Sequence, residues 1–235
     1  MSGVGIELLA YGIAFAVGAP ICYLCWRVAR RRQRALETVA RELGLEFWPR
    51  GGYPTAQFRS LSLVFTRNFF SGMYDDREVV AFDLRDSADD LNPQLGARVI
   101  TIVTTRWYQP FDNALEPEGK LIIRPERAAD KAAAAAGFTD IDFESHEFSR
   151  RFLVRSPDKK FAYAVVHARM MEHLLAYPEW WVEMNGPDLM ATNNRRWEVG
   201  EYADRFREGV KLLSGFIDLI PDHVRKDLYE KGRLG

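Results

Sequence analysis

The stretch IELLAYGIAFAVGAPICYLCW (residues 6–26), followed directly by RVARRRQR (residues 27–34), sets the architecture of this chain. Within residues 6–26 the only acidic or basic side chain is that of Glu7. These 21 residues, as a helix, extend over roughly 30 Å, which matches the hydrocarbon core of a bilayer. A soluble core helix is seldom apolar on every face. The stretch therefore predicts a transmembrane anchor over residues 1–27.

Arginines and a tryptophan at the end of the apolar run predict its orientation and a lipid interface. Basic residues beside a span stay on the cytoplasmic side, whereas a cleavable signal peptide carries them before its apolar run. We therefore expect a single pass through a prokaryotic inner membrane, with the N-terminus outside and the rest of the chain in the cytoplasm. The predicted membrane and lipid interface consists of Trp26, Arg27, Arg30, Arg31, Arg32 and Arg34.

Small residues in the predicted span are spaced so that another helix could pack closely against it. Gly12 with Ala16, and Ala14 with Gly18, follow the small-xxx-small pattern of membrane helix pairs. Helical periodicity continues beyond the arginines, which predicts a juxtamembrane amphipathic helix over residues 28–44 and one long helix from about Gly5 to Leu43. Gly44 then supplies a helix stop.

Charge and cysteine content exclude several classes of function. Residues 1–34 have a net charge of +4, and the remaining 27 basic and 32 acidic residues give −5. A mildly acidic domain argues against nucleic acid as a partner, since such a partner needs a basic surface. Cys22 and Cys25 are the only cysteines and lack the second pair or nearby histidine of a zinc site. We expect no cofactor and no metal ligands.

Residues 45–221 predict one cytoplasmic α+β domain with an antiparallel sheet and about three helices, followed by a charged tail over residues 222–235. Strands are expected at Leu45–Trp48, Leu61–Thr66, Asn68–Met73, Glu78–Leu84, Arg98–Arg106, Lys120–Ile123, Glu147–Val154, Trp180–Met184 and Leu189–Thr192. Helices are expected after Pro125, after Ser156-Pro157-Asp158 with Ser156 as the cap, and over Val199–Ile220.

Few side chains in this domain suggest chemistry, and the sequence predicts no catalytic residues. The acidic runs Asp83–Asp90 and Asp140–Glu147 could bind a cation or perform acid–base work, but a solvated loop for the first and an exposed edge strand for the second are the favoured explanations. No nucleophile elbow, Walker loop or zinc-protease motif occurs. Trp180 and Trp181 are candidate partner contacts, because one of two neighbours in a strand faces outward.

A pattern near the middle of the chain resembles a known family. A strand ending in F-x-V-x-S is followed by a capping Asp, an Ala-containing helix and M-M-E-x-L-L. This resembles a family of uncharacterised prokaryotic proteins, usually membrane-anchored and defined only by a domain of unknown function. The resemblance covers about residues 45–220 and implies an α+β fold and membrane association. The residues that carry it are Phe152, Val154, Ser156, Asp158, Ala162, Met170, Met171, Glu172, Leu174 and Leu175.

Three functions fit these observations. The first is a non-enzymatic single-pass membrane scaffold or accessory subunit, whose cytoplasmic domain stabilises a larger membrane protein complex, for example a respiratory or photosynthetic one. The second is a domain near the membrane that senses a lipid or another ligand. The third is an enzyme with an unrecognised acidic site. The partners expected for the first are membrane proteins and membrane lipids.

Overall fold

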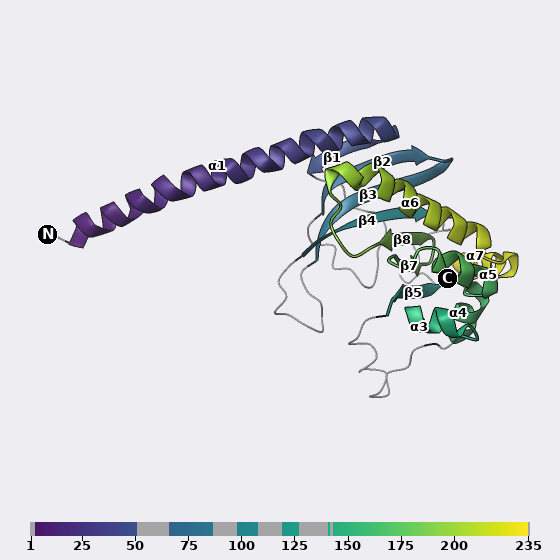
Figure 1. Cartoon of the computed structure of the whole chain (residues 1–235). Coiled ribbons are helices and arrows are strands. Elements are labelled where there is room, and N and C mark those ends of the chain that lie inside the picture. Colours follow the sequence, from purple (N-terminus) through teal and green to yellow (C-terminus); the bar gives the residue numbers. More distant parts are fainter. Residues whose placement is uncertain are drawn as a thin grey trace.

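A single long helix, α1 (Gly3–Leu43), leads into the folded domain. The computed structural model describes residues 3–50, 66–86, 98–107, 119–126, 141 and 143–234, with no side-chain description for residues 3–14, 17, 86, 98 and 229–234. The N-terminal half of α1 extends alone from the domain, and its C-terminal half lies along the sheet (Figure 1). The helix ends at Gly44, whose φ of 72° is strained for other residue types.

An eight-stranded sheet forms the centre of the domain, and every neighbouring pair of strands is antiparallel. The strand order is β1-β2-β3-β4-β8-β7-β5-β6. This confirms the predicted α+β class with an antiparallel sheet. The strands are β1 (Glu46–Arg50), β2 (Thr66–Tyr74), β3 (Arg77–Asp86), β4 (Arg98–Arg106), β5 (Lys120–Pro125), β6 (Phe152–Arg155), β7 (Trp181–Asn185) and β8 (Asp188–Thr192).

The main core lies between one face of the sheet and two helices. Helix α6 (Val199–Leu219) crosses this face, and α1 packs beside it against β1 and β2 (Figure 1). The apolar stripe of α6 matches the prediction for Val199–Ile220, because one helical period runs through the whole segment. A second apolar cluster occupies the other face of the sheet, formed by Phe69, Phe82, Leu84, Ile100, Ile102 and Met190.

The remaining described helices lie toward the β5–β6 end of the sheet: α3 (His146–Arg151), α4 (Lys159–Val165), α5 (Ala168–Leu175) and α7 (Asp222–Leu234). The predicted strand Glu147–Val154 is wrong in its first half, which forms α3. The Ser145 side chain caps α3 by accepting a hydrogen bond from the Phe148 amide. Helix α4 is capped by Asp158, two residues after the predicted Ser156.

The segment predicted as a charged tail is largely helical. Helix α7 buries Val224 and Leu228 against the core, while Asp222 lies in its first turn. The Arg225 side chain donates hydrogen bonds to the Ile217 and Ile220 carbonyls at the end of α6. These contacts attach the segment to the domain.

Three further predictions are not confirmed by the structure: one is unsupported, and two concern residues that lie wholly or mostly outside the described part. Within the part of the chain that the structure describes, no helix combines the length and hydropathy needed to cross a membrane, so the predicted transmembrane span is unsupported there. The helix predicted after Pro125 lies outside the described residues. So does the predicted strand Leu61–Thr66, except for its last residue, which begins β2.

Candidate functional site

The projecting half of α1 presents large apolar side chains to its surroundings. Phe15 is 77% exposed, Leu24 57% and Val28 66%, and Ile21 and Tyr23 are similarly exposed. Isolated exposed apolar side chains are ordinary on a protein surface, but a helix with this many close together is typical of a contact surface. This half of α1 therefore carries an exposed apolar surface, which makes it a candidate contact surface.

The small residues predicted to pack against another helix lie in the same half of α1. Ala16 is exposed, and a methyl group added to Gly18 would meet nothing within 4 Å. The side chains of Gly12 and Ala14 lie outside the described part. No described residue therefore occupies this face at Gly18.

The C-terminal half of α1 is fixed to the domain by a buried ion pair. An Arg32 guanidinium nitrogen lies 3.5 Å from the Asp83 carboxylate and donates a 2.7 Å hydrogen bond to the Trp197 carbonyl. The side chain of Arg32 is 13% exposed and that of Asp83 3%. C-terminal to this contact on the same helix, Leu36 and Ala40 are fully buried in the core. Arg32, predicted as a lipid contact, is therefore a structural residue.

Asp83 is fully engaged by protein groups, which removes it from the predicted cation site. Asn68 and Thr101 donate hydrogen bonds of 2.8 and 2.7 Å to its two oxygens, and Arg196 lies at 3.6 Å. Burial raises the pKa of Tyr202 well above its ordinary range, and the Asp83 charge adds to this shift. Asp89 and Asp90, in the same predicted run, lie outside the described residues.

A hollow of about 510 Å³ lies where α1 leaves the sheet. Helix α1 contributes Trp26, Ala29, Arg30 and Gln33, and strands β1 and β2 contribute Pro49, Arg50, Thr66 and Arg67. Arg30 lies over the Trp26 ring, with 5.5 Å from its central carbon to the ring centroid. Among the described residues, the wall of the hollow holds three arginines and no acidic residue, so it favours an anion. We call it the α1 hollow.

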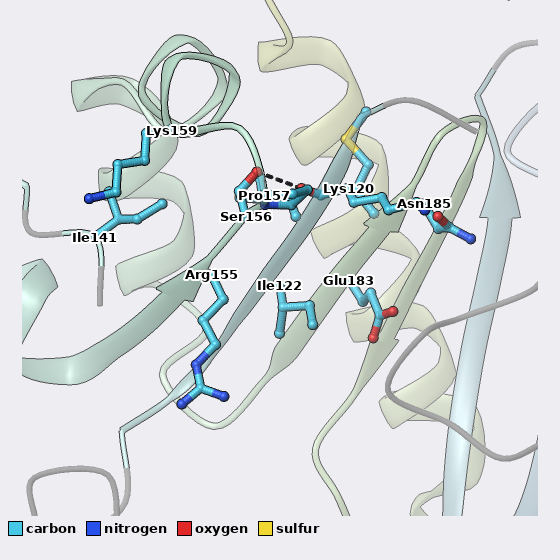
Figure 2. A pocket seen from close by; sticks show the side chains of 11 residues that line it. Lys120, Ile122, Ile141, Arg155, Ser156, Pro157, Lys159, Glu183 and Asn185 are labelled. Atoms are coloured by element: carbon cyan, nitrogen blue, oxygen red, sulfur yellow. Dashed lines mark hydrogen bonds between the residues drawn. The ribbon is translucent and has the colours of Figure 1, made fainter. Parts of the chain in front are cut away.

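A second hollow, of about 460 Å³, lies at the opposite end of the sheet (Figure 2). Arg155, Ile122 and Glu183 form a row across β6, β5 and β7, as the strand register requires, and point to one side of the sheet. Ser156 donates a 2.7 Å hydrogen bond to the Lys120 carbonyl and shapes the rim. Both signs of charge line this hollow, so its chemistry is mixed.

The two predicted tryptophan contacts lie in or against the core. Trp180 is 2% exposed and packs edge-on against Trp197 at 5.8 Å between ring centroids. A methyl group added to Gly209 on α6 would approach the Trp180 ring to 3.0 Å. Trp181 is half-buried against the second apolar cluster. Trp180 is thus a packing residue, and only Trp181 is partly accessible.

The predicted acidic run Asp140–Glu147 forms no cluster of carboxylates among the described residues. Asp140 and Asp142 lie outside them, Glu144 is exposed, and Glu147 pairs with Arg151 at 3.3 Å within α3. None of the described carboxylates of this run lines either hollow. The described residues also contain no group of three or more potential metal ligands.

Sequence reasoning found the helix side of the α1 hollow but missed its strand side. Arg30 and Trp26 were predicted from their position after the apolar run. Arg50 and Arg67 lie on separate strands and become neighbours only because β1 pairs with β2. No local pattern in the sequence indicates that pairing.

Comparison with known proteins indicates a fold and no family. No protein-family model and no curated protein matches the chain, so the resemblance to an uncharacterised membrane-anchored family stays a prediction. A solved structure, the mycobacterial trehalose monomycolate transport factor A (TtfA), is similar with a TM-score of 0.50 and 13% sequence identity. The match covers 81% of this chain and 94% of that one. At this identity the likeness concerns the fold alone.

Proposed function

We propose that this protein is a membrane-associated accessory factor that holds its α+β domain against a larger membrane protein complex. The observation that carries the proposal is the exposed apolar surface on the projecting half of α1. A bilayer or a membrane protein supplies the apolar partner that this surface needs. In this proposal residues 6–26 lie in the inner membrane and the domain lies in the cytoplasm, on the side of the arginines.

The attachment of α1 to the domain supports a scaffolding role. Because α1 is assigned as one continuous helix and the apolar stripe of its C-terminal half is buried in the core, the proposed arrangement holds the domain at a fixed position relative to the membrane surface. A flexible tether would leave that position free. A fixed domain is what an accessory subunit needs to present one surface to a neighbouring protein, and the proposed role requires no catalysis.

A transport assembly is the host that we propose. The similar solved structure is, by its title, a transport factor, and the two chains correspond over most of their lengths. The partners in this proposal are therefore membrane proteins of a transport complex together with membrane lipids.

Membrane attachment is tested by fractionation of the full chain after a carbonate wash. The pair Ile21→Asp and Leu24→Asp should release the protein into the supernatant, since each places a charge on the exposed apolar surface. Met73→Asp with Tyr163→Asp is the matched control, because these are equally exposed apolar residues on the domain. Release of the control pair, or retention of the α1 pair, would contradict the attachment.

Membership of a complex is tested separately, by extraction in a mild detergent. The tagged chain should migrate with a large assembly that contains other membrane proteins. Migration of the native chain as a monomer after gentle extraction would refute the accessory role and leave the attachment result intact.

A further inference from the structure

The α1 hollow carries an unbalanced positive charge. Arg50 and Arg67 are direct cross-strand partners in the β1–β2 pair, an arrangement of like charges that destabilises a sheet. Arg30 reaches the same hollow from α1. None of these three side chains forms an ion pair with another described residue. An anion in the hollow would relieve this repulsion.

Among the described residues, the carboxylate that faces Arg67 across the strand pair already has other partners. Asp83 on β3 is the register partner of Arg67, but its carboxylate receives Arg32, Arg196, Asn68 and Thr101. It therefore stabilises the α1 attachment and leaves the hollow positive. Among the described residues no carboxylate pairs with Arg50 or Arg67, and an anion from outside the chain would offset their repulsion.

The groups in the hollow match the chemistry of a phosphate ester. A guanidinium presents paired N–H donors that fit two phosphate oxygens, and three arginines can surround one such group. Gln33 adds polar atoms for neighbouring hydroxyls, and the Trp26 ring offers an apolar wall. A volume of about 510 Å³ exceeds the needs of an inorganic ion and suits a headgroup with its glycerol.

The position of the hollow indicates the source of the phosphate. Trp26 and Arg30 lie directly after the exposed apolar side chains Ile21 and Leu24 on the same helix. A lipid whose chains lie along those residues would place its phosphate beside Arg30. We propose that the α1 hollow binds the phosphate headgroup of an anionic phospholipid, an inference that rests on the proposed membrane attachment.

Calorimetric titration of the purified full chain in uncharged maltoside micelles tests this site. Dioctanoyl phosphatidylglycerol should bind at least about fivefold more tightly than zwitterionic dioctanoyl phosphatidylcholine. The triple variant Arg30→Gln, Arg50→Gln, Arg67→Gln should lose that preference. Equal affinity for the two lipids in the native chain would overturn the proposal.

A matched variant separates the hollow from general charge effects. Lys160→Gln, Arg169→Gln and Lys211→Gln remove three exposed basic residues from α4, α5 and α6 and should leave the preference unchanged. An equal loss in both triple variants would refute a localised site. Thermal unfolding of both variants verifies that each has folded.

A further titration distinguishes a lipid headgroup from a soluble phosphate compound as the ligand. Glycerol 3-phosphate should bind much more weakly than dioctanoyl phosphatidylglycerol, and equally tight binding would assign the hollow to a soluble phosphate compound and overturn the lipid source. Because the titration uses purified protein in micelles, its outcome is independent of the carbonate fractionation. A chain that stays in membranes without any lipid preference refutes this inference alone.

Discussion

The two halves of α1 belong to one helix and meet opposite surroundings. From Phe15 to Val28 the large apolar side chains that the structure describes are more than half exposed, whereas Leu36 and Ala40 are fully buried. The change occurs around Arg32, whose guanidinium reaches into the domain. Both halves are rich in apolar residues, so the apolar content of the helix does not distinguish them. Whether such a residue belongs to the core or to an exposed surface depends on whether the domain covers it.

The same contrast divides the arginines that follow the apolar run. Arg32 is bound to Asp83 and the Trp197 carbonyl, Arg30 lines the α1 hollow, and Arg31 and Arg34 are exposed. Neighbouring arginines in the sequence thus have three different environments. Arg32 is structural, Arg30 is a candidate ligand contact, and Arg31 and Arg34 are solvated. Breaking each half in turn tests this division.

The largest effect is expected from Asp83→Ala, at the point where the buried half is fixed. Removing the carboxylate leaves Arg32 buried without its partner and strands the donors on Asn68 and Thr101. The free energy of unfolding should fall by about 3–5 kcal/mol. Urea unfolding followed by tryptophan fluorescence measures it. Glu78→Ala, an exposed change on the same strand, should remain within about 0.5 kcal/mol of the native chain.

The next largest effect comes from making the same Leu→Ala substitution in each half of α1 and comparing the two losses of stability. Leu36→Ala should lower the free energy of unfolding by about 2–5 kcal/mol, because it opens a cavity in the core. Leu24→Ala removes the same atoms from an exposed site and should change it by less than about 0.5 kcal/mol. Urea titrations of both variants provide the measurement, and similar losses would show that the projecting half also packs on the domain.

A smaller difference should distinguish neighbouring arginines. Arg32→Gln removes a charged hydrogen bond to the Trp197 carbonyl, and Arg196 still lies near Asp83. We expect a loss of about 1–3 kcal/mol in the free energy of unfolding. Arg31→Gln changes an exposed residue and should have almost no effect. Chemical unfolding that ranks Arg31→Gln as the more harmful would contradict the assignment of Arg32 as the attachment point.

The smallest effect concerns pH at the N-terminal end of α6, close to the buried half of α1. Hydrogen bonding from Arg195 lowers the pKa of Glu201 from its ordinary 4.5 to about 2. The ionised form is therefore favoured in the folded chain, and its contribution is complete above pH 4.5 and lost as the pH falls toward 2. Since both side chains are partly exposed, we expect less than about 1 kcal/mol.

Glu201→Gln should remove this contribution, so that its stability relative to the native chain improves as the pH falls from 4.5 to 2. Thermal melts across that range measure the difference. Glu172→Gln, an exposed carboxylate on α5, serves as the control and should keep the native pH dependence. A native pH dependence in Glu201→Gln would contradict the role of the Arg195 contact.

The sequence predicted the elements that have one clear period and left the contacts between distant segments unpredicted. Strand Arg98–Arg106 has the predicted bounds, and α6 differs from its prediction by one residue at the C-terminal end, because each pattern is uninterrupted. At α3 and β6 the chain changes from helix to strand without a glycine or proline, so the boundary at Phe152 was missed. Hydrophobic periodicity has no signal for such a change.

The candidate site divides in the same way. Position in the sequence was enough to select Trp26 and Arg30, since both follow the apolar run. The partner of Arg32 is Asp83 on β3, and this pairing depends on the packing of α1 against α6, β1 and β2. Arg50 and Arg67 join the hollow through strand pairing alone. The sequence identifies these arginines as charged groups, and only the fold shows which groups lie beside each of them.

The packing of α1 against α6 has a consequence for the newly made chain. Arg32 and the Trp197 carbonyl are in contact but 165 residues apart, so the ribosome completes the second long after the first. At 5–20 residues per second this interval is roughly 10–30 s. Until α6 is made, the apolar stripe from Leu36 to Leu43 lacks the cover that α6 supplies in the folded domain, so this stretch is exposed to aggregation during that time.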